Sequence, residues 1–160
     1  MKITDILNQR GKTVFTVKTD TSAIDAVGIM DKNKVGAVIV LDKKGNVAGI
    51  LSERDVLYKC YNSGVELKDQ TVNNLMTGVE DILIGKIDST AHDLMNVMLY
   101  RKVRHLPVIE NEQIVGMLSV EDIMKMMLDS YENESHQLRE YIKNPFGVHI
   151  YEGNKKESKQ

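Results

Sequence analysis

Two short segments of this 160-residue chain carry the same pattern: a glycine, two apolar residues, a serine and, three positions later, an aspartate. The first is Gly49-Ile-Leu-Ser52-Glu-Arg-Asp55 and the second is Gly116-Met-Leu-Ser119-Val-Glu-Asp122. A carboxylate can accept hydrogen bonds from two neighbouring hydroxyls at once. A hydroxyl beside free N–H groups at a helix N-terminus favours an anion. The pattern suits a polar, anionic ligand, and the alternative is that each serine and aspartate only caps a helix.

The two segments belong to longer repeats. Residues 22–30 match residues 90–98 with hydroxyl, alanine, aspartate and methionine in register, and residues 34–42 match residues 102–110. After one residue is lost in a turn, 47–56 matches 114–123, and the leading segments 3–7 and 72–76 also resemble each other. Periods of this length are typical of duplicated structural units. The sequence therefore predicts repeats over 1–62 and 72–130, a linker over 63–71, and an extension over 131–160.

Basic side chains are distributed unequally between the repeats. Arg54 lies inside the first pattern, and its counterpart in the second is Glu121, which would repel a phosphate. Arg104 and His105 precede the second pattern, whereas 36–37 in the first repeat is Gly-Ala. The positive charge near the two patterns thus comes from Arg54 in one repeat and from the Arg104–His105 pair in the other.

Both repeats predict the same order of elements, β-α-β-β-α. Ser22 and Thr90 are expected to cap helices whose apolar residues recur at i, i+3, i+4 and i+7. Strands are predicted over 35–41 and 47–51, and over 103–109 and 114–118, after short strands near 14–17 and 82–84. A repeat of ~60 residues would be marginal alone. We expect an α/β (α+β) fold in which the two repeats pack through their sheets with pseudo-two-fold symmetry.

The C-terminal extension differs from the repeats. Residues 121–142 predict one long helix with an apolar stripe, which Pro145 and Gly147 end. Residues 146–151 predict a short strand or a packing arm, and the lysine-rich residues 153–160 a disordered tail.

The repeated signature, together with Val-Arg-His-Leu-Pro-Val at 103–108, resembles the cystathionine-β-synthase-type (CBS) domain family over about residues 3–130. The resemblance implies a Bateman module with two potential ligand clefts between the repeats. It implies that Ser52 and Ser119 contact phosphate and that Asp55 and Asp122 hold the ribose diol. It also implies phosphate contacts from the basic residues, namely Arg54, Arg104 and His105. We therefore expect Arg54 from one repeat and the Arg104–His105 pair from the other to converge on one phosphate.

No side chain that would read a purine base is evident, so we expect adenine to lie between aliphatic walls. The expected wall consists of Val35, Gly36, Ala37, Val38, Ile50 and Met117. The resemblance implies an adenine nucleotide as regulatory ligand, AMP first and ADP or ATP next, without an obligatory cofactor. NADH and S-adenosylmethionine also bind in such folds.

Composition and hydropathy argue against several classes of protein. The net charge of -2, the absence of tryptophan and the presence of only two phenylalanines argue against nucleic-acid binding. The single cysteine, Cys60, indicates a reducing compartment, and no apolar run approaches a signal peptide or a membrane span, so we expect a cytoplasmic protein. No histidine has metal-ligand spacing, and no catalytic motif is found.

These observations predict a sensor module without catalysis that regulates a protein partner. The resemblance also implies a homodimer, for which we expect a methionine-rich face near Met95, Met98 and residues 124–127. The alternative is a structural or interaction module with vestigial ligand sites, docking through its C-terminal helix.

Overall fold

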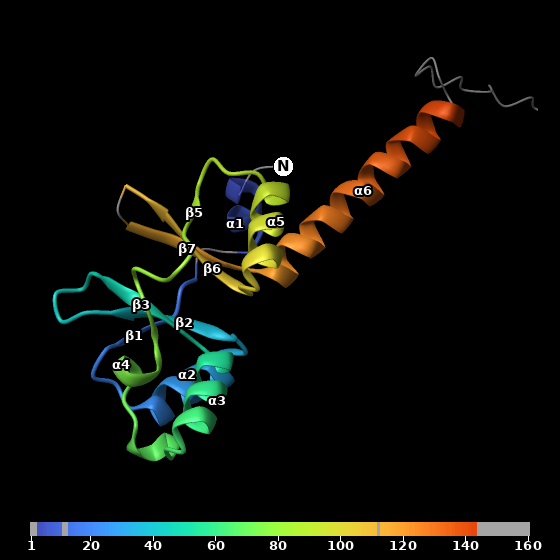
Figure 1. Cartoon of the computed structure of the whole chain (residues 1–160). Coiled ribbons are helices and arrows are strands. Elements are labelled where there is room, and N and C mark those ends of the chain that lie inside the picture. The colour runs from blue at the N-terminus through green and yellow to red at the C-terminus, as the bar shows by residue number, and fades with distance from the viewer. Residues whose placement is uncertain (1–2, 11–12, 112, 144–160) are drawn as a thin grey trace, which may run out of the picture. The chain divides into compact units, whose positions relative to one another are not determined.

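A computed structural model describes residues 3–10, 13–111 and 113–143 (Figure 1). They form a mixed α/β fold with two sheets, as predicted. The chain divides into a compact unit that ends at Met124 and a second unit that begins at Lys125. The expected helix break at Pro145, the arm at 146–151 and the tail at 153–160 lie outside the described residues.

Both repeats contain the predicted β-α-β-β-α order. The first comprises β1 (Thr16–Lys18), α2 (Ala23–Asn33), β2 (Ala37–Leu41), β3 (Val47–Ser52) and α3 (Glu53–Ser63). The second comprises β5 (Gly85–Lys86), α5 (Ala91–Arg101), β6 (His105–Glu110), β7 (Gln113–Ser119) and α6 (Val120–Lys143). The long predicted helix is thus present as α6. The strand predicted near 82–84 is wrong in position, because β5 begins only at Gly85.

Within each repeat the first two strands are parallel and the last two antiparallel. The parallel pair is possible because a helix makes the crossover between its strands. Alternate residues of β2 face opposite sides of the sheet. Val38 and Val40 pack in a core with α2, whereas Ile39 packs in a second cluster with Met117 of β7. The second face of the sheet therefore packs against the other repeat, as predicted.

The helix that leads into each repeat packs on the other repeat. The leading helix of the second repeat, α4 (Val72–Leu75), buries Val72 and Leu75 in the core of the first repeat. The strand after it, β4 (Thr77–Gly78), pairs with β3. Conversely, Leu7 of α1 (Ile3–Arg10) lies against Gly116 of β7. The similarity of the two leading segments was visible in the sequence. Their exchange, in which the leading helix of each repeat packs on the other repeat, was not.

This exchange explains the glycine that opens each signature. A Cβ at Gly49 would collide with the backbone carbonyl of Thr77, and a Cβ at Gly116 would collide with the side chain of Leu7. Each glycine therefore allows the other repeat's leading segment to approach its sheet closely.

One local prediction needs correction, and the segment predicted as a linker, 63–71, has local structure. Gly64 caps the C-terminus of α3 in the left-handed conformation, η1 (Leu67–Asp69) follows, and Leu67 packs against the core of the first repeat. The correction concerns the helix caps. Ser22 precedes α2 but makes no side-chain cap, whereas Thr90 caps α5 by accepting a hydrogen bond from the Asp93 N–H at 3.1 Å. The Ala23 N–H is instead bonded to the Gln70 carbonyl, so a backbone partner serves the start of α2.

The turn predicted between β2 and β3 forms around Asp42. Its carboxylate accepts hydrogen bonds from the backbone N–H of Lys44 and from the backbone and side chain of Asn46. The Asn46 side chain is the largest cause that holds the pKa of Asp42 below its usual value.

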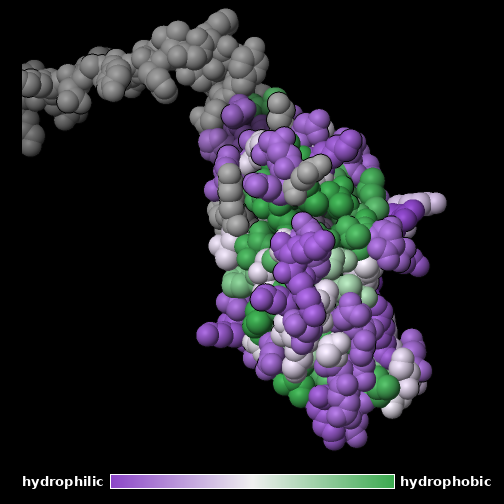
Figure 2. Space-filling model, turned by 90° about the vertical axis from the view of Figure 1, so that its left-hand side faces the viewer, coloured by the Kyte–Doolittle hydropathy of each residue, from purple (hydrophilic) through white to green (hydrophobic). Residues whose placement is uncertain are grey.

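Apolar side chains reach the surface on the β-hairpins and on several helices of the described residues. A groove between the two β-hairpins is lined by Val14, Leu41, Val47, Ile109 and Ile114. Figure 2 faces this side of the molecule and shows hydrophobic residues among hydrophilic ones. Exposed large apolar residues of the helices include Leu57, Tyr58 and Tyr61 on α3, Leu99 and Tyr100 on α5, and Met124, Leu128, Tyr131 and Leu138 on α6.

The predicted methionine-rich dimer face needs correction. Met95 and Met98 are buried, because the apolar stripe of α5 faces the interior of its repeat. Met124 is exposed. The exposed apolar residues of α5 itself are Val97, Leu99 and Tyr100.

Candidate functional site

The first signature forms a reciprocal capping box at the start of α3. The Ser52 hydroxyl accepts a hydrogen bond from the Asp55 N–H at 3.2 Å, and the Ser52 N–H donates to Asp55 Oδ2 at 2.9 Å. The hydroxyl also donates to Asp55 Oδ2 at 2.6 Å. Helix capping, the alternative to ligand binding, is therefore a real role of these two residues, worth about 1 kcal/mol for such a cap.

The second signature repeats this geometry at the start of α6. The Ser119 N–H and hydroxyl donate to Asp122 Oδ2 at 2.8 and 2.6 Å, and the Asp122 N–H donates to the Ser119 hydroxyl at 3.1 Å. The two copies are equivalent within their own helices, so any functional difference must come from their surroundings.

Asp55 has a further partner that the sequence analysis missed. The Thr77 hydroxyl, on β4, donates to Asp55 Oδ1 at 3.0 Å. Lys59 lies 4.0 Å from the same oxygen and donates to the carbonyls of Leu75 and Met76 at 2.9 and 2.6 Å. Thr77 and Lys59 therefore connect the signature of the first repeat to the leading segment of the second. Recognising this from sequence would have required knowledge of the exchange.

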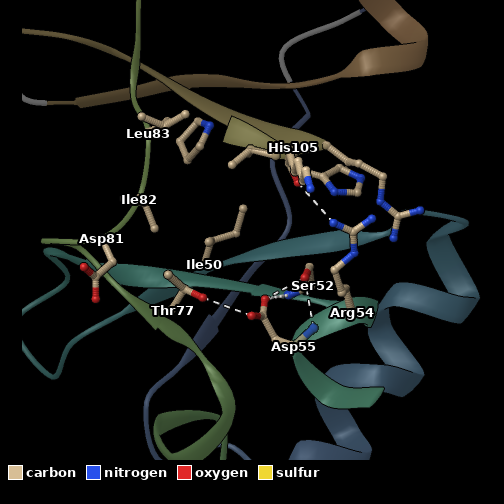
Figure 3. A pocket seen from close by; sticks show the side chains of 13 residues that line it. Ile50, Ser52, Arg54, Asp55, Thr77, Asp81, Ile82, Leu83 and His105 are labelled. Carbon is tan, nitrogen blue, oxygen red and sulfur yellow. Dashed lines mark hydrogen bonds between the residues drawn. The ribbon is translucent and has the colours of Figure 1, made fainter. Parts of the chain in front are cut away.

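A pocket opens above this capping box (Figure 3). Its empty space amounts to about 620 Å³, which includes open solvent. The pocket joins residues of both repeats: Ile50, Ser52, Arg54, Asp55, Thr77, Asp81, Ile82, Leu83, Lys102, Val103, Arg104, His105 and Pro107. Five of the seven predicted ligand-binding residues thus line one pocket.

The two ends of this first pocket differ in character. In Figure 3, Ile82 and Leu83 lie at one end, while Arg54 and His105 lie at the other. Ser52 and Asp55 lie along the floor between them. Ile82 and Leu83 were expected in a strand, and their apolar side chains instead line the pocket. The arrangement offers one end with Ile82, Leu83 and the carboxylate of Asp81, a hydroxyl and a carboxylate in the middle, and a cationic end.

Arg54 joins the two repeats directly. Its Nη1 donates a hydrogen bond to the backbone carbonyl of Lys102 at 3.1 Å. Lys102 ends α5 in the left-handed conformation, with φ at 55°. Arg54 is therefore oriented towards the segment that carries Arg104 and His105.

A second pocket lies at the other signature. Its lining includes Ser119 and Glu121 of the second repeat and, from the first, Lys34 and Glu53. The remaining lining residues are Thr13, Phe15, Val35, Gly36, Ala37, Arg104, His105 and Met117. Asp122 is held in its capping box with Ser119. Two acidic residues, Glu53 and Glu121, thus line the second pocket. In the first pocket, the position equivalent to Glu121 is occupied by Arg54.

The residues expected to form an adenine wall are divided. Ile50 lines the first pocket, and Val35, Gly36, Ala37 and Met117 line the second. Val38 is fully buried in the core of the first repeat, on the sheet face that packs against α2.

Within the described residues, no three or more His, Cys, Asp or Glu side chains come together as a metal site. In the same part of the chain, no helix has the length and apolarity needed to cross a membrane.

Comparison with known proteins assigns the family. The sequence profile of the CBS domain matches residues 4–62 and 74–129. The mitochondrial CBS domain-containing protein CBSX3 of Arabidopsis thaliana is 30% identical over 147 residues, which cover 88% of this chain and 71% of that protein. The chain therefore belongs to the CBS domain family and carries two CBS domains in tandem.

Solved structures agree with this assignment. The CBS-domain protein ATU1752 of Agrobacterium tumefaciens has a TM-score of 0.74 and 34% sequence identity, covering 79% of this chain and 99% of its own. The CBS domain protein PAE2072 of Pyrobaculum aerophilum, solved in complex with AMP, has a TM-score of 0.66 and 18% identity. It covers 76% of this chain and 89% of its own and shares the fold.

Proposed function

We propose that this chain is a regulatory module that binds an adenine nucleotide, AMP first, in the pocket at Ser52 and Asp55, and that it catalyses no reaction. The observation that carries the proposal is that Arg54 and His105, from two repeats, lie at one end of a pocket that Arg104 also lines, while Ile82 and Leu83 lie at the other end. A nucleotide has the same polarity, with a flat base at one end, a diol in the middle and a phosphate at the other.

Each part of the ligand has a proposed partner. The base lies against Ile50, Ile82 and Leu83, the ribose diol reaches Asp55, and the phosphate faces Arg54 and the segment 102–105. Charge-assisted hydrogen bonds of this kind are the stronger ones in proteins. The AMP complex of the CBS domain protein from Pyrobaculum aerophilum supports this ligand class.

The capping box sets a condition on binding. A carboxylate offers about four acceptor positions, and Asp55 already accepts from the Ser52 N–H, the Ser52 hydroxyl and Thr77. If the Ser52 hydroxyl turns to donate to the phosphate, it releases a position on Asp55 for the second ribose hydroxyl. One rotation therefore serves both ends of the nucleotide.

The test is a thermal-shift screen of the purified chain with AMP, ADP, ATP, NADH, S-adenosylmethionine and GTP. A ligand at about 100 times its Kd stabilises the fold by about 2.7 kcal/mol, which is a measurable rise in Tm. We expect AMP to raise Tm and GTP to leave it unchanged. A rise only with NADH or S-adenosylmethionine would change the ligand class, and no rise with any compound would overturn the proposal.

A second candidate function is protein interaction, which the exposed apolar side chains of α3 and α5 favour. Tyr61 is 83% exposed, Tyr100 85% and Leu57 65%, and large apolar residues at the surface often mark contact sites. We propose these helices as the face for a homodimer or a regulated partner. Light scattering of the wild type and of the double variant Leu57→Lys, Tyr61→Lys tests the homodimer, and a mass equal to one chain for both excludes it.

A further inference from the structure

The two pockets occupy equivalent positions, and their backbones confirm the equivalence. The carbonyl of Gly36 accepts a hydrogen bond from the Glu53 N–H at 3.0 Å. The carbonyl of Arg104 accepts one from the Val120 N–H at 3.0 Å. Gly36 is thus the counterpart of Arg104 in space as well as in sequence. At this position the second repeat carries the Arg104 side chain, whereas Gly36 of the first repeat carries none.

The space left by that missing side chain is taken by the other repeat. A Cβ on Gly36 would lie 2.8 Å from Cε1 and 3.0 Å from Nε2 of His105. These distances are shorter than carbon contacts in well-packed proteins, whose optimum is ~3.5–4.0 Å. The His105 ring can stand there only because position 36 is glycine.

His105 and Arg104 also line both pockets. They form a partition between the two pockets. The first pocket adds the cations Arg54 and Lys102 and the carboxylates Asp55 and Asp81. The second pocket adds the single cation Lys34 and the carboxylates Glu53 and Glu121. A phosphate beside Arg104 and His105 therefore has two further cations in the first pocket and one in the second. The same two residues cannot serve two phosphates at full strength.

We propose that the chain binds a single nucleotide, in the first pocket, and that Gly36 is a positioning residue that holds His105 as the wall between the pockets. This inference rests on the proposed function. A change in the second pocket should therefore alter binding in the first. A side chain introduced at Gly36 would displace the His105 ring, which is a proposed phosphate contact in the first pocket.

The first experiment is isothermal titration calorimetry of the full chain with AMP. We expect a single class of sites with one AMP per chain. A stoichiometry of two per chain would overturn this inference and leave the proposed function intact. The absence of binding would overturn the proposed function itself, and this inference with it.

The second experiment is a double-mutant cycle on Gly36→Ala and His105→Ala. Gly36→Ala displaces the ring, so we expect roughly tenfold weaker AMP binding, the scale of one hydrogen bond to a charged group. In the His105→Ala background, Gly36→Ala has no ring to displace and should change the affinity less than twofold. An equal loss in both backgrounds would overturn the positioning role.

The matched control is Gly28→Ala, in the same repeat, where a new Cβ meets no atom within 4 Å. Its AMP affinity should equal that of the wild type. Binding of adenosine separates positioning from general damage: because adenosine carries no phosphate, Gly36→Ala should weaken it far less than AMP. Equal loss of adenosine and AMP affinity would contradict the inference.

Discussion

The guanidinium of Arg54 in the first repeat donates a hydrogen bond to the backbone carbonyl of Lys102 in the second, 48 positions later in the chain. This contact brings together two segments that alignment of the repeats does not pair, since the counterpart of Arg54 is Glu121. Basic residues of both repeats, Arg54 of the first and Arg104 of the second, therefore line the same pocket.

Replacement of Arg104 should lower the affinity for the phosphate-bearing nucleotide and leave the affinity for the nucleoside nearly unchanged. Loss of one charge-assisted hydrogen bond costs about 1.5–3 kcal/mol, so Arg104→Ala should weaken AMP binding roughly tenfold to a hundredfold. Adenosine should lose little affinity. Calorimetry with both ligands checks this, with Arg101→Ala as the control. Equal losses for the two ligands would mean that Arg104 acts through packing.

Replacement of Asp55, by contrast, should weaken the binding of AMP and adenosine equally. Its proposed partner is the ribose, which AMP and adenosine share, so Asp55→Ala should weaken both by a similar factor, roughly tenfold or more. The comparison requires a folded variant, because the change also removes half of the capping box. Circular dichroism at the titration temperature verifies folding, and unchanged affinity for both ligands would exclude the ribose role.

The two signature serines provide a matched pair. Each caps a helix with the same geometry, so Ser52→Ala and Ser119→Ala should each lower the free energy of unfolding by about 1 kcal/mol. Only Ser52→Ala should weaken AMP binding, because only Ser52 lines the first pocket. Urea titration gives the stability and calorimetry the affinity. Equal loss of affinity in the two variants would refute the assignment of the ligand to one pocket.

The signature glycine should be sensitive for reasons of packing alone. In Gly49→Ala the new methyl group would collide with the Thr77 carbonyl, a backbone atom that cannot rotate away. Overpacking of this kind costs about 1–3 kcal/mol. Gly28→Ala, with open space around it in α2, should instead be neutral or raise stability by about 0.5–1 kcal/mol. Urea unfolding of both variants tests the difference, and a neutral Gly49→Ala would contradict the close approach.

Much of the fold could be predicted because the same sequence pattern occurs in both repeats. The helices after Ser22 and Thr90 and the paired strands follow from periodicities that recur in register, and the structure confirms them. The basic residues could be assigned to one end of a pocket because the alignment exposed their unequal distribution. Local patterns of this kind survive folding when tertiary contacts agree with them.

The remaining features depend on contacts between distant segments. Ile82 and Leu83 read as a strand, yet they line the pocket, because the strand pairing begins only at Gly85. Thr77 carries no motif and becomes a partner of Asp55 only after its segment crosses to the other repeat. Gly36 appeared as a position without charge, and its role as space for a histidine ring required the packed structure.

The crossing of the leading helices has a consequence for how such a protein can evolve. With α4 in the core of the first repeat and α1 on the sheet of the second, each half completes its partner's interior. A single repeat cut out at the chain's midpoint would carry its partner's helix and lack its own. The two repeats therefore form one evolutionary unit, because neither has a complete hydrophobic interior without the leading helix of the other.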